Sequence, residues 1–222
     1  DTVTKKNSHE DILNSFKKDG IDILIGTQMV VKGHDFPNVT LVGVIAADSS
    51  LNIDDYRAHE RTFQTLTQVA GRAGRGKDKG RVIIQTYNPD AFCIQYSQKQ
   101  DYKLFYDTEI HLRKQLRYPP FCDIILIGVS SKSYKELEET SNKIYESLKA
   151  KIHTEKLQIL LYKPVPAPID RIKNKFRWRI IVKCIVGEPI INAIDDTVKN
   201  AENKNTKNDT RIVVDVNPSN ML

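Results

Sequence analysis

The chain has 222 residues, with 34 Lys and Arg against 28 Asp and Glu and a formal charge of +6. Its 40% hydrophobic content excludes a disordered chain, and no apolar run approaches the roughly 18 residues that a membrane-spanning helix needs. The length allows two compact domains, and the modest positive charge permits an anionic partner such as nucleic acid without requiring one.

The first half of the chain alternates helices and strands in the order of an α/β domain with a parallel sheet. Its short apolar runs suit parallel strands covered on both faces. The predicted elements, in chain order, are a helix at 8–19, strands at 21–25 and 39–46, a helix at 55–70, a strand at 81–86, and helices at 90–98 and 102–116.

The proline pair at Pro119 and Pro120 marks the predicted domain boundary, which divides the chain into residues 1–116 and 117–222. The order βαββαβ in the second domain is typical of a small ferredoxin-like α+β sandwich. Its predicted elements are a strand at 123–129, a helix at 133–151, a strand at 157–161, a Pro-rich crossing at 164–168, a strand at 176–184, a helix at 189–202 and a strand at 211–216.

The cysteines favour a reducing compartment. Cys93, Cys122 and Cys184 are odd in number, far apart and in no CxxC pair, so we predict neither a disulfide framework nor a zinc or other metal site. The chain opens at Asp1 without a Met or a signal peptide, and we therefore expect a fragment of a longer protein.

The most specific segment is Gln68-Val-Ala-Gly71-Arg72-Ala-Gly74-Arg75-Gly76, at the end of the predicted helix 55–70. Two arginines three residues apart can converge on one anion, such as a transferring γ-phosphoryl group, and the glycines allow a phosphate to come close. For a segment of this kind alone, the alternative is a basic helix end that complements its own dipole.

A second polar segment follows the strand predicted at 21–25. Thr27 and Gln28 stand at the end of that strand, where small polar groups can meet a backbone phosphate. Gly33 and Asp35 can form a turn that presents a carboxylate to a ribose at the edge of an open parallel sheet. Turn residues and a helix cap are the alternative interpretation, and His34 and His59 nearby are read as packing or hydrogen-bonding residues.

Cations fall on alternate residues late in the chain, with apolar residues between them. In an extended chain this pattern places the cations on one face, which can follow a phosphate backbone or form the solvated side of a sheet. The cations are Arg171, Lys173, Lys175, Arg177 and Arg179.

The segments at 25–37 and 68–76 together resemble motifs V and VI of a superfamily 2 helicase, in its second RecA-like lobe. The match extends to Asp48-Ser-Ser-Leu51, to Asp55-Tyr-Arg57, to the proline hinge at 117–121, to Pro164-Val-Pro-Ala-Pro168 and to Asp215-Val-Asn-Pro218. With these segments the chain is similar to the C-terminal part of the bacterial primosomal replication-restart helicases, the PriA family.

This resemblance implies an ATP-dependent 3′-to-5′ DNA helicase that recognises stalled forks and initiates primosome assembly. It implies that Arg75 is the arginine finger, that Arg72 binds the γ-phosphate, and that Gln68 senses the γ-phosphate or positions water. Asp35 with Gly33 would contact the nucleotide, and Thr27 and Gln28 the translocated strand.

The family's P-loop and DExH motif have no counterpart in the chain, so the resemblance gives it half of an ATPase site and predicts no activity in isolation. ATP and Mg²⁺ would be shared with the missing lobe, and zinc would belong only to the missing part. Forked and single-stranded DNA, single-strand-binding protein and primosome proteins would be the partners of a monomer in the bacterial cytoplasm, at the fork and away from membranes.

Two other functions stay open from the sequence. The chain can be a non-catalytic module that docks DNA or single-strand-binding protein, and a P-loop and DExH sequence upstream of Asp1 would decide against that. An RNA helicase of the same superfamily would share the motifs but would not explain the segments after residue 117.

Overall fold

The computed structural model describes residues 12–16, 21–27, 39–73, 80–203 and 209–221. The chain divides into two compact units, a first unit of residues 1–53 and 57–107 and a second unit of residues 54–56 and 108–222. The division falls inside helix α6 (Tyr102–Gln115). The domain boundary at 116/117 stays a prediction.

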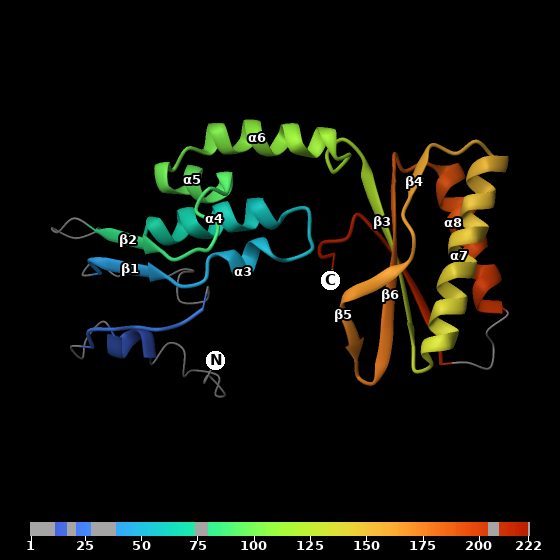
Figure 1. The fold of residues 1–222 in the computed structure, drawn as a ribbon, viewed down its shortest axis with the longest axis horizontal. Helices are drawn as coiled ribbons and strands as arrows, with labels where there is room; N and C mark the ends of the chain where they lie inside the picture. Colours follow the sequence, from blue (N-terminus) through green and yellow to red (C-terminus); the bar gives the residue numbers. More distant parts are fainter. Residues whose placement is uncertain (1–11, 17–20, 28–38, 74–79, 204–208, 222) are drawn as a thin grey trace. The chain divides into compact units, whose positions relative to one another are not determined.

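The first unit contains a parallel pair of strands with helices packed on it (Figure 1). Strands β1 (Leu41–Val44) and β2 (Arg81–Ile84) pair with Leu41 opposite Arg81, within the two predicted strand ranges. The first unit also contains helices α3 (Asp48–Leu51), α4 (Ala58–Ala70) and α5 (Phe92–Lys99) and the start of α6. Residues 12–16 are helical too, within the helix predicted at 8–19. The buried core consists of Ala47, Phe63, Leu66, Cys93, Ile94 and Phe105.

Two expectations for the first unit are wrong. Residues 21–25 lie in no helix or strand, and Ile25 is 88% exposed. Among the described residues, the β1–β2 pair is also not covered on both faces, because Leu41 is 57% exposed and Ile83 is 51% exposed. Side chains alternate between the faces of a strand, so one face of the described pair packs on the helices and the other carries apolar side chains in contact with solvent.

The second unit is an α+β sandwich, as predicted. Its elements are β3 (Asp123–Ser131), α7 (Tyr134–Thr154), β4 (Ile159–Leu161), β5 (Val165–Ile172), β6 (Lys175–Cys184), α8 (Glu188–Asn203) and β7 (Arg211–Val216). The antiparallel sheet has the order β4-β6-β3-β7, with β5 also paired to β6. Helices α7 and α8 run side by side over one face of the sheet (Figure 1).

The core of the second unit lies between this sheet and α7 and α8. Alternate residues of β3 (Ile125, Ile127 and Val129) and of β6 (including Ile180 and Val182) are buried there against Leu137, Ile144 and Leu148 of α7. Phe176 and Trp178 pack against the same cluster. The alternation predicted for 171–179 therefore holds within β6, and its cations at 175, 177 and 179 point to the opposite face.

The Pro-rich segment is a strand and not a crossing, which corrects the predicted βαββαβ order. Strand β5 contains Pro166 and Pro168 and pairs with β6 alone among the described strands. An edge strand tolerates proline because its outward N–H groups need no partner strand. Lys173 and Asn174 connect β5 to β6 with φ of 48° and 61°, as in a type I′ turn.

Candidate functional site

Two of the predicted ATP-site residues lie at the C-terminal end of helix α4, one in its last turn and one just after it. The helix buries Ala58, Thr62, Phe63, Leu66 and Val69 and leaves Gln68 exposed. It ends at Ala70, where the Gly71 N–H donates to the Thr67 carbonyl (3.1 Å) and the Arg72 N–H donates to the Val69 carbonyl (3.0 Å). Arg72, half-buried, follows in the turn, four residues after Gln68.

Arg75 and its flanking Gly74 and Gly76 lie outside the described residues, so the spacing of Arg75 from Arg72 is not tested. The same holds for Gln28, Gly33, His34 and Asp35. Thr27 is described and is exposed at the end of 21–27. Gln68 and Arg72 both lie at the C-terminal end of α4, and the ATP site, these two residues included, stays a prediction.

Gly71 has room for a side chain within the fold itself. A Cβ at this position would meet the carbonyl oxygens of Gln68 and Thr67 at 3.6 and 3.7 Å, which is ordinary van der Waals contact. Its φ of −70° is also accessible to any residue. Among the described residues, therefore, nothing in the fold requires glycine at this position.

Asp48 joins the carboxyl ends of the two parallel strands and was not singled out from the sequence for this role. Its carboxylate accepts from the Thr86 hydroxyl (2.7 Å), the Tyr87 N–H (2.8 Å) and the Asn88 N–H (3.2 Å). These hydrogen bonds, that of Thr86 first, lower the pKa of Asp48. The sequence shows an Asp after an apolar strand, which is a signal for a polar group at the end of that strand. It does not show the hydrogen-bond partners, because they lie about 40 residues later.

His59 has a packing role in the described structure. Its ring meets the edge of Phe92 with centroids 4.8 Å apart. This contact joins α4 to α5 and agrees with the expectation that it is a packing residue.

The five alternating cations do not form one ribbon, which corrects the expectation for an extended chain. The turn at Lys173 and Asn174 reverses the chain, and Arg171 lies opposite Phe176 across the hairpin. Opposite residues of an antiparallel pair share a face, and the Arg171 guanidinium stands 5.0 Å from the Phe176 ring centroid. Arg171 is therefore on the other side of the hairpin from Lys175.

The remaining cations of the hairpin differ in their exposure. Lys173 is exposed at the turn, and half-buried Arg177 donates to the Ile169 carbonyl (3.2 Å). Arg179 is only 5% exposed, forms an ion pair with Asp54 and donates to the Met221 carbonyl (2.5 Å). Arg171, Lys173 and Arg177 are thus the better placed cations for an external phosphate.

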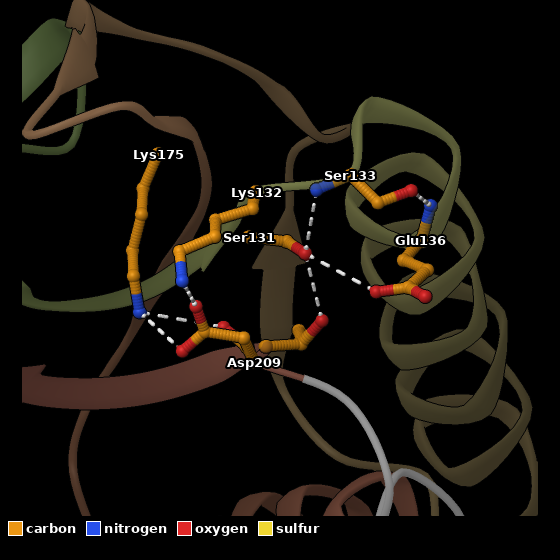
Figure 2. Close-up of polar contacts among 7 residues, drawn as sticks. Ser131, Lys132, Ser133, Glu136, Lys175 and Asp209 are labelled. Atoms are coloured by element: carbon orange, nitrogen blue, oxygen red, sulfur yellow. Dashed lines mark hydrogen bonds and ion pairs between the residues drawn. The ribbon is translucent and has the colours of Figure 1, made fainter.

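Lys175 forms an ion pair with Asp209, two residues before β7. Figure 2 shows Lys132 and Lys175 converging on Asp209, with N···O distances of 2.8 and 2.7 Å. These two lysines, Lys132 first, lower the pKa of Asp209 to about 2. Ser131 extends the cluster, because its hydroxyl donates to Glu136 (3.4 Å) and accepts from Thr210 (3.0 Å).

Within the described parts of the chain, no group of three metal-ligating side chains stands close enough to hold an ion, and no helix is long and apolar enough to cross a bilayer. The donors present at the end of α4, an amide and a guanidinium beside a glycine, suit the phosphates of a nucleotide. A carboxylate to bind Mg²⁺ would come from residues other than these three at the end of α4.

Two protein families match the chain. Residues 114–219 match the primosomal protein N C-terminal domain, and residues 1–77 match the helicase conserved C-terminal domain. Among solved structures, a de novo designed protein, Foldit4, covers 42% of the chain at 7% identity with a TM-score of 0.33.

Proteins named replication restart protein PriA are similar over most of the chain. That of Bacillus subtilis strain 168 is 39% identical over 100% of the chain, that of Synechocystis 44% over 82%, and that of Borreliella burgdorferi 39% over 82%. The matches cover 27%, 22% and 27% of those proteins. The chain therefore spans about a quarter of the length of these curated relatives.

Proposed function

Because the chain belongs to the PriA family of replication restart proteins, we propose that it is the C-terminal part of an ATP-dependent 3′-to-5′ DNA helicase. The whole protein would act at stalled or recombined forks in the bacterial cytoplasm, where it would initiate primosome assembly. Forked and single-stranded DNA, single-strand-binding protein and primosome proteins are the proposed partners of a monomer.

The observation that carries the proposal is the pair of ATP-site candidates at the end of α4. Gln68 projects from the exposed side of the helix and Arg72 follows one turn later, in a segment that continues to Arg75. An ATP γ-phosphate carries negative charge that spreads over its oxygens during transfer, and fixed guanidinium groups stabilise that charge.

In this proposal Arg75 is the arginine finger, Arg72 binds the γ-phosphate, and Gln68 positions water or senses the phosphate. ATP and Mg²⁺, bound by the missing lobe, would supply the phosphoryl group and the metal that neutralises it. Gly33 and Asp35 would contact the nucleotide. The resemblance assigns none of these residues to the β-phosphate, so the chain would supply one side of the site.

DNA binding by the second unit is proposed for the exposed cations of the β5–β6 hairpin. Arg171, Lys173 and Arg177 lie at or near its tip, and Lys175 would contribute after release from Asp209. Contacts of this kind bind phosphates with little sequence preference and weaken as salt rises. Thr27 and Gln28 would contact the translocated strand.

Replacing Arg75 in the intact protein tests the proposal. Arg75→Ala should lower DNA-stimulated ATP turnover by about three orders of magnitude and leave fork binding nearly unchanged, because the finger acts on transition-state charge. Arg75→Lys should also have low ATP turnover, since lysine does not reproduce the planar guanidinium. Arg81→Ala, which removes an exposed arginine at the start of β2, is the matched control and should retain wild-type turnover. A parallel fall in DNA affinity and turnover for Arg75→Ala would contradict the assignment.

A non-catalytic docking module is the second candidate, favoured by the basic hairpin and by the missing phosphate-binding loop. An open reading frame without a P-loop and DExH sequence upstream of this chain would support it. The similarity of residues 114–219 to the primosomal protein N C-terminal domain favours a DNA helicase over an RNA helicase of the same superfamily.

A further inference from the structure

Tyr87, just after β2, differs from the other tyrosines of the chain in the surroundings of its ring. The chain has nine tyrosines, and all of them lie in the described parts. Eight of them contact a second aromatic ring or a cation. Tyr87 makes no such contact among the described residues, and it is 93% exposed. Packing within the described first unit therefore does not account for an aromatic side chain at this position.

The backbone that carries this ring is held firmly. The Tyr87 N–H donates to the Asp48 carboxylate (2.8 Å). The same carboxylate accepts from the Thr86 hydroxyl (2.7 Å) and from the Asn88 N–H (3.2 Å), so the residues on both sides of Tyr87 are tied to it as well. A fixed backbone with a free ring can bind a flat ligand at little further cost in conformational entropy, because few side-chain torsions remain to be ordered.

Tyr87 also lies at the edge of the sheet where α/β domains bind ligands. Figure 1 shows β1 and β2 side by side, and because they are parallel, their carboxyl ends lie at the same edge. Ligands of open α/β sheets bind outside this edge. Ala46, two residues after β1, has a φ of 54° there, which is a left-handed conformation that costs energy in a residue other than glycine and is frequent at ligand sites.

The charges around Tyr87 decide which part of a nucleic acid its ring can contact. Asp48 is bonded to its N–H and Asp90 lies three residues later, and both carboxylates would repel a phosphate. A nucleobase is neutral, and its flat face stacks on an aromatic ring whatever the base sequence. The ring therefore suits the bases of a strand and not its backbone.

We propose that Tyr87 is a stacking platform for a base of single-stranded DNA, at the carboxyl edge of the β1–β2 pair. This inference rests on the proposed function, in which the protein moves along a single strand. It adds a contact with a base to the phosphate contacts proposed for the β5–β6 hairpin. A stacked base is not read by hydrogen bonds, so the contact tolerates any sequence, as movement along DNA requires.

A DNA strand without bases tests this contact separately from phosphate contacts. In the intact protein, Tyr87→Ala should weaken binding to a thymidine oligonucleotide by about tenfold, within the range for one base–aromatic stack. The parent and Tyr87→Ala should bind an abasic oligonucleotide with the same number of phosphates equally, since no base is present to stack. Fluorescence anisotropy over a salt titration should give both proteins the same slope of log affinity against log salt, because no phosphate contact is lost.

Three further variants identify what the ring contributes. Tyr87→Phe should keep the parental affinity, because the ring stacks and the hydroxyl does not. Tyr87→Leu should bind as weakly as Tyr87→Ala, because leucine is apolar but has no flat π-face. This variant matters because Ile45, at the same edge, is 79% exposed and could serve an apolar partner protein. Tyr106→Ala removes an exposed tyrosine from the part of α6 in the first unit and is the matched control, which should keep the parental affinity.

The outcomes separate this inference from the proposed function. If the intact protein shows DNA-stimulated ATP turnover but Tyr87→Ala binds both oligonucleotides like the parent, the helicase proposal stands and the platform is wrong. An equal loss on both oligonucleotides, or parental binding by Tyr87→Leu, would also overturn the platform. If DNA does not stimulate turnover but Tyr87→Ala loses affinity only for the strand with bases, the helicase proposal fails and the platform stands. No binding of single strands by the intact protein would overturn both.

Discussion

At the scale of single residues, the most informative position is Gly71, because nothing in the described fold requires a glycine there. Gly71→Ala should leave the chain as stable as the parent or more stable by about 0.4–1 kcal/mol, since alanine restricts the unfolded chain. In the intact protein the same change should reduce ATP turnover, because the added methyl group would obstruct the phosphate. Thermal unfolding measures the predicted effect on stability, and steady-state ATPase assays measure the predicted effect on turnover. A clear loss of stability would show that glycine serves the fold.

The stabilising role of Asp48 depends on pH. Its pKa is lowered in the folded state, so its ionised form stabilises the fold above the unfolded pKa of about 3.9, and that stabilisation is lost as pH falls through the lower folded value. Asp48→Asn should therefore reduce the free energy of unfolding at pH 7, and its stability should fall less than that of the parent below pH 4. Denaturant unfolding from pH 7 to pH 3 measures this difference. Parallel pH profiles would refute the role given to Asp48.

Sequence reasoning about single residues predicts roles where the chemistry is local and fails where it depends on distant partners. Gln68 and Arg72 are predicted from neighbouring positions in one short segment at the end of α4, and their roles in an ATP site stay predictions. Asp48 was missed as a link between strands because Thr86, Tyr87 and Asn88 come 38 to 40 residues later. The burial of Arg179 was missed for the same reason, since its partners Asp54 and Met221 lie far away in sequence.

At the scale of elements, strongly periodic segments were predicted well and edge features were not. Helices α7 and α8 and strands β3 and β7 begin within one residue of their predicted positions, because their apolar periods reflect one buried face. Strand β5 was missed because prolines argue against a central strand, and only the tertiary fold makes it an edge. The apolar run at 21–25 was predicted as a strand, but no described strand pairs with it.

The Asp209 cluster yields a prediction for the β5–β6 hairpin. Asp209→Asn releases Lys132 and Lys175 and should raise DNA affinity, with the slope of log affinity against log salt steeper by about one phosphate contact. Asp195→Asn changes the charge equally, at an exposed pair on α8, and should affect DNA binding much less. Fluorescence anisotropy over a salt titration measures both. Equal effects of the two variants would mean that net charge alone changes the DNA affinity. The hairpin would then no longer belong to the proposed DNA interface.

At the scale of the whole molecule, the chain is a C-terminal part of a longer protein of the PriA family, with one unit similar to a helicase lobe and one α+β unit. The sequence predicted this division through the change from α/β order to α+β order. It did not predict that residues 54–56, between two helices of the first unit, belong to the second unit. That residues 54–56 belong to the second unit depends on their contacts with Arg179 and Tyr118, which are more than 60 residues away from them in the sequence.

The central claim is that this chain supplies one side of an ATPase site whose phosphate-binding loop lies elsewhere in the protein. The most direct measurement is ATP hydrolysis by the purified 222-residue chain beside the intact protein, each with saturating forked DNA. We predict no turnover above background for the chain and DNA-stimulated turnover for the intact protein, since the chain lacks the loop and the carboxylate that hold the phosphates and Mg²⁺. DNA-stimulated hydrolysis by the chain alone, or none by the intact protein, would contradict the account.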